Sequence, residues 1–163
     1  GICVSDGLEI QLSSWTDGCV RCHDMTTYEL LWKHARAHRS AVTAIAVSSS
    51  MKFFVTGSAE GDIKIWDMRT RELKGELKDH LQAVVALQVF DDDRHVLSAS
   101  KDRTLISWDI VGMKRLTSHE AHSGPLTSMF LTKNQCGAYT SGADHTIAHW
   151  DLRQREPVRR IPY

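Results

Sequence analysis

The sequence lacks an excess of charge of either sign. Twenty Lys and Arg residues balance twenty Asp and Glu residues, so the formal net charge of the 163-residue chain is zero. Proteins that bind nucleic acid or anionic membrane surfaces by general electrostatic attraction usually carry a basic excess. We therefore predict neither a nucleic-acid partner nor a membrane partner.

Long apolar runs and closely spaced cysteines are also missing. The longest apolar run, residues 41–47, is interrupted by Thr43 and falls far short of the ~20 residues that cross a bilayer. The first residues show neither the basic region nor the apolar core of a signal peptide. Because the chain begins at Gly1 rather than Met, we expect it to be a piece of a longer protein. Four scattered cysteines are too few for a disulfide framework, which favours a reducing, cytoplasmic compartment; they are Cys3, Cys19, Cys22 and Cys136.

Three common enzyme motifs are absent as well. The sequence contains no phosphate-binding P-loop, no dinucleotide-binding glycine motif and no zinc-protease His-Glu-x-x-His motif. Each of these would place a nucleotide, a cofactor or a metal ion on the chain. Their absence favours a non-catalytic protein that binds other proteins, without a cofactor and without a small-molecule substrate.

The sequence does contain an internal repeat. The dipeptide Trp-Asp recurs every 42 residues, and a histidine recurs with the same period. A degenerate earlier copy has His23 in place of the Trp. The copies predict four repeats with approximate bounds 1–37, 38–79, 80–121 and 122–163. Their landmarks are Trp66, Trp108 and Trp150 for the dipeptide, and His38, His80 and His122 for the histidine.

Each repeat has the pattern of short β-strands. In the repeat 38–79, β-prone segments alternate polar and apolar residues and are separated by turn residues. The last segment is the most polar, as expected for the outer edge strand of a sheet. The pattern predicts four strands per repeat, near residues 43–47, 53–56, 62–66 and 71–77.

A repeat of this length that opens with His and closes with Trp-Asp resembles the WD40 family. The resemblance implies an all-β propeller of four-stranded blades around a central channel. We expect about four blades of a larger, commonly seven-bladed, propeller. Four blades cannot close such a ring, so the parent chain or a second protein is expected to cover the open faces. The implied function is a protein-interaction scaffold in a multi-subunit assembly.

The same resemblance implies a buried hydrogen-bond network in each repeat. The network joins a loop His, a Ser or Thr on the second strand, an acidic residue in the next turn and the Trp. We expect a structural role, because a carboxylate fixes the imidazole tautomer and because the set recurs, which argues against a catalytic triad. In the first repeat only Asp17 matches, and in the fourth Gly142 replaces the hydroxyl. The predicted members are His38, Ser58, Glu60 and Trp66, then His80, Ser100, Asp102 and Trp108, and finally His122, Asp144 and Trp150.

A narrower resemblance is to the C-terminal propeller of cilia- and flagella-associated WD-repeat proteins, which line the lumen of axonemal doublet microtubules. It implies an axonemal location, with tubulin or other axonemal proteins as partners. The similarity departs at residues 117–131, where a regular His-containing opening occurs. The segments that carry it are residues 12–18, 37–46, 97–102, 107–111 and 140–150.

Two further motifs leave alternatives open. Arg69 and Arg153 each follow a Trp-Asp pair by two residues, which resembles the box by which some WD40 proteins dock a cullin-ring ubiquitin ligase adaptor. The simpler interpretation is that both arginines are solvated. Cys19, Cys22 and His23 form a Cys-x-x-Cys-His pattern that can attach haem c. This segment coincides with a predicted third strand, so we expect buried cysteines and no cofactor.

Overall fold

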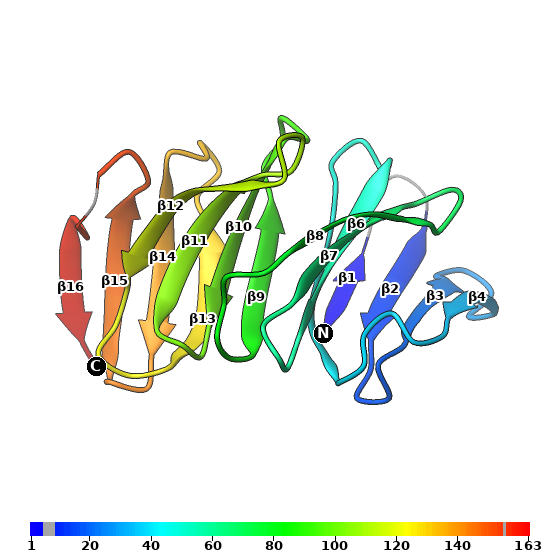
Figure 1. Cartoon of the computed structure of the whole chain (residues 1–163), viewed down its shortest axis with the longest axis horizontal. Helices are drawn as coiled ribbons and strands as arrows, with labels where there is room; N and C mark the ends of the chain where they lie inside the picture. Colours follow the sequence, from blue (N-terminus) through cyan, green and yellow to red (C-terminus); the bar gives the residue numbers. More distant parts are fainter. Residues whose placement is uncertain (5–8, 155) are drawn as a thin grey trace.

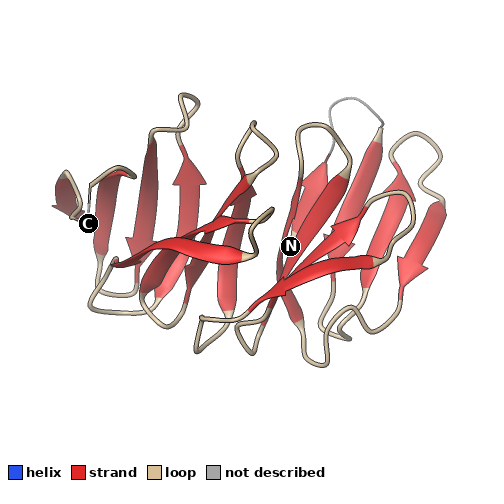
Figure 2. Cartoon of the chain, turned by 45° about the horizontal axis from the view of Figure 1, so that its top comes forward, coloured by secondary structure: helices blue, strands red, loops and turns tan. Residues whose placement is uncertain are grey.

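The computed structural model is built only from β-strands and the loops that connect them (Figures 1 and 2). It describes residues 1–4, 9–154 and 156–163. Within these ranges there are sixteen strands, arranged as four antiparallel sheets of four strands each. The predicted all-β class and the arrangement as a propeller fragment of about four blades are confirmed.

Each sheet takes four consecutive strands of the chain and falls within one predicted repeat. We number the sheets as blades in chain order. Blade 1 holds β1 (Ile2–Val4), β2 (Ile10–Ser14), β3 (Val20–Asp24) and β4 (Leu30–His34). Blade 2 holds β5 (Val42–Val47), β6 (Phe53–Ser58), β7 (Ile63–Asp67) and β8 (Leu73–Leu77). Blade 3 holds β9 (Val84–Val89), β10 (His95–Ser100), β11 (Thr104–Asp109) and β12 (Lys114–Glu120). Blade 4 holds β13 (Leu126–Leu131), β14 (Gly137–Gly142), β15 (Thr146–Asp151) and β16 (Arg159–Pro162).

The blades stand side by side along the long axis of the molecule (Figure 1), and the first strands of neighbouring blades contact each other. Burial falls from the inner to the outer strands. Strand β6 is buried along its whole length, whereas β16 is exposed along its whole length. The fourth strand of each blade is a sheet edge.

The hydrophobic core lies between the blades. Successive side chains of a strand point to opposite faces, so each inner blade presents two apolar faces. Val55 and Ile65 of blade 2, for example, pack with Val96 and Trp108 of blade 3 in one cluster. Two similar clusters join blade 1 to blade 2 and blade 3 to blade 4. Burial of each such side chain contributes about 1.5–3 kcal/mol, so contacts with a neighbouring blade stabilise each blade.

The turn between the second and third strands has the same left-handed backbone in every blade. The residue is Gly18 (φ 75°) in blade 1, Gly61 (φ 96°) in blade 2, Arg103 (φ 76°) in blade 3 and His145 (φ 58°) in blade 4. At Gly61 a Cβ atom would collide with the carbonyl oxygen of His80. This close approach brings the turn of one blade against the loop that enters the next.

Candidate functional site

A chain of hydrogen bonds joins the polar side chains of blade 3. Trp108 Nε1 donates to Ser98 Oγ (2.8 Å), which lies 2.7 Å from His80 Nε2. His80 Nδ1 lies 2.9 Å from Asp102 Oδ2. An indole only donates and an ionised carboxylate only accepts. In the neutral imidazole, Nδ1 therefore donates its hydrogen to Asp102, and Nε2 accepts a hydrogen bond from Ser98, which in turn accepts the indole N–H of Trp108. The loop histidine is thereby fixed in one tautomer and one orientation.

Blade 4 repeats the arrangement. His122 Nε2 lies 2.9 Å from Thr140 Oγ1, which also accepts the indole N–H of Trp150 at 2.9 Å. His122 Nδ1 faces the carboxylate of Asp144 at 3.0 and 3.1 Å. Both histidines and both tryptophans are buried. Two copies with the same geometry support a structural role, because buried networks with every group satisfied make a packed structure rigid.

The predicted hydroxyl partner is wrong in both complete networks. In blade 3 the hydroxyl comes from Ser98 rather than from Ser100. In blade 4 the sequence predicts no hydroxyl, because Gly142 stands at the expected position, but Thr140 supplies one. Residues two apart on a strand share a face, so the sequence offered two equivalent candidates. Ser100 instead holds the turn: its hydroxyl donates to Gln82 O at 2.9 Å and accepts from the backbone N–H of Asp102 at 3.1 Å.

The carboxylates of these networks stay ionised. Burial alone would raise the pKa of Asp102, but hydrogen bonds from His80, Thr104 and the backbone of Leu81 hold it well below its ordinary value. Asp144 has the same balance, with Thr146 and His122 as the side-chain donors that lower its pKa. The acidic groups act as fixed acceptors for the imidazole and for the loop that carries it.

Blade 2 has the same network except for the carboxylate that accepts from Nδ1 of the histidine in blades 3 and 4. His38 Nε2 lies 2.7 Å from Thr56 Oγ1, which also accepts the indole N–H of Trp66 at 2.8 Å. Thr56 therefore takes the role predicted for Ser58, which instead accepts backbone N–H groups of Glu60 and Asp62, each at 3.2 Å. Glu60, at the position of Asp102, is exposed. Within the residues that the structure describes, His38 Nδ1 has no hydrogen-bond partner.

Burial and the nearby Lys64 ammonium lower the pKa of His38 to about 4. The imidazole is therefore neutral at neutral pH. Its buried Nδ1 lacks the acceptor that stabilises the equivalent histidines in blades 3 and 4.

Blade 1 builds a different pair at the equivalent place. Ser13 corresponds to Thr56, and its Oγ accepts the indole N–H of Trp15 at 2.9 Å. The Arg21 guanidinium lies 3.9 Å from the centre of the Trp15 ring and pairs with Asp17 at 2.8 Å. Sequence reasoning missed Trp15, because its position in the repeat is that of Ser58 and gave no sign of an indole donor.

Neighbouring blades meet through the same position on the outer strand. His34 of blade 1 packs on Trp66 of blade 2, with ring centroids 4.4 Å apart, and His119 of blade 3 packs on Trp150 of blade 4 at 5.4 Å. Leu77 occupies this position in blade 2 and lies in one cluster with Trp108. Each of these residues covers the Trp of the next blade.

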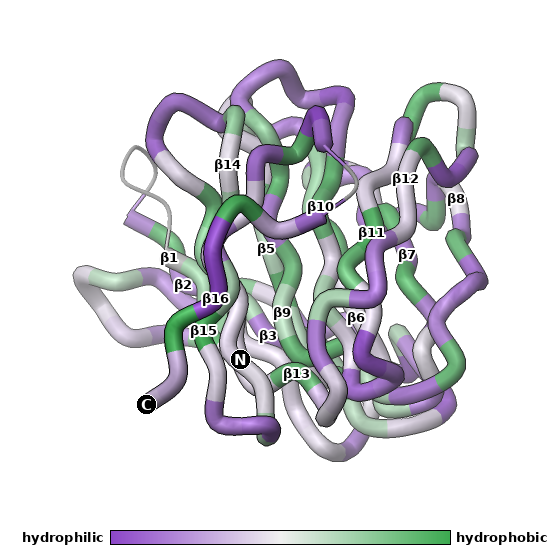
Figure 3. The backbone as a smooth tube through the Cα atoms, turned by 90° about the vertical axis from the view of Figure 1, so that its left-hand side faces the viewer, coloured by the Kyte–Doolittle hydropathy of each residue, from purple (hydrophilic) through white to green (hydrophobic). Residues whose placement is uncertain are grey.

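In blade 4, the face that would pack against a following blade is exposed. Ile161 holds the position of His119 and is 41% exposed. Phe130 pairs across the sheet with Tyr139, which stacks on His149 at 4.6 Å. Leu97, one repeat before Tyr139, is fully buried against blade 4. In Figure 3, which views this end of the molecule, apolar and hydrophilic segments alternate over β15 and β16.

The two candidate docking arginines differ in their surroundings. Both lie in the turn after the third strand, where the preceding aspartate accepts the arginine backbone N–H. Arg153 folds back on Asp151 with two contacts of 2.9 Å. Asp67 pairs instead with Lys74 at 3.0 Å, and the exposed Arg69 makes no ion pair with any described residue.

The Cys-x-x-Cys-His segment lies at the start and along the length of β3. Cys22 is fully buried in the cluster between blades 1 and 2, and burial raises the pKa of its thiol. Cys19 is 5% exposed. His23 follows Cys22 on the strand and therefore points to the opposite face. Among the described residues, no three His, Cys, Asp or Glu side chains come together as metal ligands.

Three segments of the chain, residues 30–67, 71–109 and 113–151, match the family model described as WD domain, G-beta repeat. The chain belongs to the WD40-repeat family. Each matched segment begins with the outer strand of one blade and ends with the third strand of the next, as β4 does with β5–β7. The WD40 sequence repeat thus straddles two sheets. In the described part of this WD40 chain, no helix is long and apolar enough to cross a membrane.

Several similar proteins carry the name cilia- and flagella-associated protein 52. The human protein is 32% identical over 168 aligned positions, covering 96% of this chain and 25% of the relative. The Chlamydomonas reinhardtii protein is 30% identical over 159 positions, covering 96% and 26%. A chicken p21-activated protein kinase-interacting protein 1-like is 34% identical over 116 positions, covering 71% and 31%. The ciliary resemblance is confirmed, and this WD40 chain spans about a quarter of the length of the ciliary relatives.

Proposed function

We propose that this WD40 chain is a non-catalytic interaction scaffold. The observation that carries the proposal is the structural use of its polar residues. The His, hydroxyl and Asp sets that resemble catalytic triads are buried and bonded to a Trp in successive blades. These residues hold loops in place, and the loops and the free blade faces remain for partners.

We further propose that the four repeats, 1–37, 38–79, 80–121 and 122–163, are consecutive blades of a larger ring. The support is the exposed face of blade 4, which repeats the positions that other blades bury. Exposed apolar patches of this kind mark interaction surfaces. A further blade of the longer protein is the occupant that fits the repeat.

The proposed setting is the ciliary or flagellar axoneme, with tubulin or other axonemal proteins as partners. The support is the similarity to relatives named cilia- and flagella-associated protein 52 in organisms as distant as human and Chlamydomonas reinhardtii. The fold alone carries no such assignment, because propellers serve many functions.

Cross-linking mass spectrometry on the native complex tests the proposal. Cross-links from the exposed Lys101 or Lys133 to tubulin or another axonemal protein are expected. Absence of axonemal partners from complexes that do contain cross-linked Lys101 would contradict the axonemal setting.

A second candidate function is docking of a ubiquitin ligase adaptor through Arg69. It is favoured by one observation, namely that the Arg69 guanidinium is exposed and makes no ion pair among the described residues. Arg153 serves as the matched comparison, because its guanidinium is already bound by Asp151. Under this candidate, Arg69→Glu abolishes adaptor capture and Arg153→Glu reduces it less; loss of axonemal partners instead would oppose it.

A further inference from the structure

The loop that enters blade 2 contains a buried imidazole nitrogen, His38 Nδ1, that has no hydrogen-bond partner in the described part of the chain. His38 is 3% exposed and is anchored at Nε2 by Thr56, as the equivalent histidines of blades 3 and 4 are anchored by Ser98 and Thr140. The anchoring fixes the direction of Nδ1 as well. It points to the place where Asp102 and Asp144 hold their carboxylates in the other two blades.

The proton on this imidazole belongs to Nδ1. Thr56 has one hydroxyl proton and already accepts the indole N–H of Trp66. The Thr56 hydroxyl can donate this proton in a hydrogen bond only to Nε2 of His38. Nε2 is then the acceptor, so the hydrogen of the neutral imidazole is on Nδ1. In blades 3 and 4 the carboxylate that accepts from Nδ1 also accepts the backbone N–H of the next residue, Leu81 or Ser123, each at 2.9 Å. In blade 2 that next residue is Arg39.

Neither acidic residue nearby fills the position. Glu60 is exposed, and among the described residues its carboxylate makes no hydrogen bond or ion pair. Asp62 holds the position of Thr104 and pairs with Lys78 at 4.0 Å. The hydroxyl of the neighbouring Ser40 is buried and has no partner among the described residues. Two polar groups of one short loop thus lack partners.

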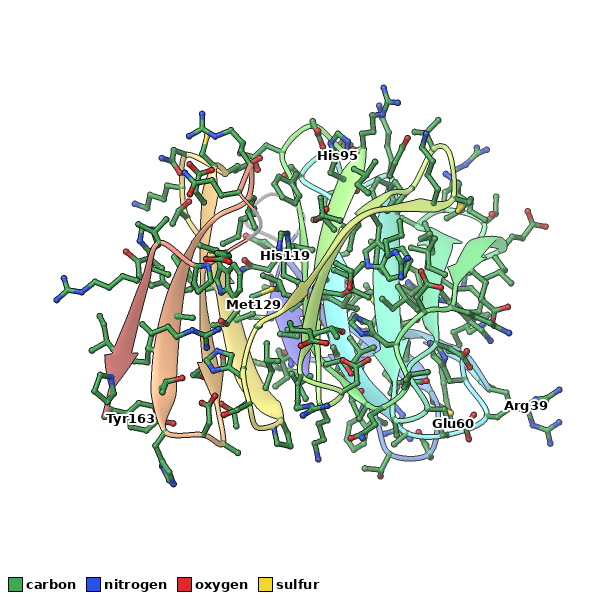
Figure 4. The ribbon with its side chains drawn as sticks, turned by 60° about the vertical axis from the view of Figure 1, so that its left-hand side comes forward. Arg39, Glu60, His95, His119, Met129 and Tyr163 are labelled. Atoms are coloured by element: carbon green, nitrogen blue, oxygen red, sulfur yellow. The ribbon has the colours of Figure 1, made fainter. Side chains whose placement is uncertain are left out.

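Two arginines of the same loop lie near this gap, together with the acidic Asp62 and Glu76. Arg36 and Arg39 are exposed in the same loop and make no ion pair with any described residue. Figure 4 shows Arg39 and Glu60 at the same end of the molecule, and a backbone bond from Ala59 to Ala41 (2.9 Å) joins their loops. A carboxylate that reached His38 would meet these guanidinium groups, which bind carboxylates with good geometry.

We infer that the loop between blades 1 and 2 is a docking site for an acidic segment of a partner protein. A glutamate or aspartate carboxylate of that segment accepts from His38 Nδ1 and from the backbone N–H of Arg39. Further acidic residues of the segment pair with Arg36 and Arg39. The site takes from a partner the carboxylate that blades 3 and 4 supply internally. This inference rests on the proposed scaffold function and names the chemistry of one partner.

The test titrates the full chain with a capped glutamate-rich peptide, with a peptide of the same length carrying glutamine as control. Binding is followed by fluorescence anisotropy, and the imidazole nitrogens by long-range 1H–15N correlation spectra. The glutamate peptide is expected to bind and to shift the Nδ1 resonance of His38. His80 and His122 serve as internal controls that do not shift, because Asp102 and Asp144 already occupy them.

Two variants of one residue sharpen the test. Glu60→Asp places an internal carboxylate on Nδ1 and is expected to weaken peptide binding at least about tenfold, or about 1.4 kcal/mol. Glu60→Gln removes a repelling charge without filling the position and is expected to bind at least as tightly as the parent chain. The inference is overturned if Glu60→Asp binds the peptide as the parent does. It is also overturned if the free parent already shows a His38 Nδ1 shift like that of His80. Native partners retained by Glu60→Asp in the cross-linking experiment leave the scaffold proposal standing and reject only this site.

Discussion

Trp15 donates its indole N–H to Ser13 in blade 1, at 2.9 Å, and so replaces the bond that a third-strand Trp makes in the other blades. The donor is the residue that directly follows the second strand, β2, and lies two residues from its acceptor. The third-strand position is left to His23. A hydroxyl on the second strand therefore keeps an indole partner in all four blades, although the source of that indole differs.

Replacing Trp108 with alanine is expected to lower the free energy of unfolding by about 3–5 kcal/mol. The ring is 2% exposed, so its loss leaves a cavity between blades 2 and 3 and removes the indole donor to Ser98. Denaturant titration measures the effect. Trp15→Ala is the matched control and should cost less, because Trp15 is 43% exposed. A loss below about 1 kcal/mol for Trp108→Ala would contradict the role assigned to the interblade core.

Replacing Glu60 with aspartate is expected to stabilise the chain by about 1 kcal/mol, because a buried donor gains an acceptor. Thermal unfolding at neutral pH checks the sign. The reverse change in blade 3, Asp102→Glu, is expected to destabilise by a similar amount. If both substitutions shift the unfolding midpoint in the same direction, a carboxylate next to Nδ1 of the histidine does not stabilise the fold.

Stability is expected to fall as the pH decreases from about 6.5 to about 4. The pKa of His38 is lowered to about 4 in the folded chain, so in this window the unfolded chain takes up a proton that the folded chain does not. Urea titrations at pH 7 and pH 5 measure the loss. In Glu60→Asp the new carboxylate favours the charged imidazole, so the loss should shrink. An equal loss in both proteins would show that His38 is not its source.

The exposed face of blade 4 is expected to drive self-association of the isolated chain. Tyr139→Lys should reduce light scattering at high concentration and leave the free energy of unfolding within about 0.5 kcal/mol of the parent value, as surface substitutions generally do. Leu97→Lys, at the same position one repeat earlier, should unfold the chain because Leu97 is fully buried. Unchanged association in Tyr139→Lys would mean that this face does not attract partners.

The repeat spacing predicted the fold because the same residues recur with a fixed period. Trp66, Trp108 and Trp150 marked the third strands, and the histidines marked the loops that enter the blades. The hydroxyl of the network was less predictable. A strand repeats its orientation every two residues, so Thr56 and Ser58 were equally placed in the pattern, and only the packed positions of His38 and Trp66 select Thr56.

Two features of the candidate site had no sequence signal of this kind. Ile161 lies one repeat after His119. Its exposure depends on whether another blade packs against blade 4, and the residue type at position 161 does not reveal this. The unpaired Nδ1 of His38 depends on the direction of the Glu60 side chain. Glu60 is exposed, whereas the aspartates at the equivalent positions of blades 3 and 4, one methylene shorter, hold their carboxylates at Nδ1 of the imidazole.

The location of the core between sheets has a consequence for how the molecule opens. No blade has two apolar layers of its own, so the smallest cooperative unit is a pair of neighbouring blades, and the coupling resembles that of a linear chain of nearest neighbours. Blades 2 and 3 have a neighbour on each side, whereas blades 1 and 4 have one. Amide hydrogens of β6, β7, β10 and β11 should therefore exchange with solvent last, after the two ends of the array have already opened and closed many times.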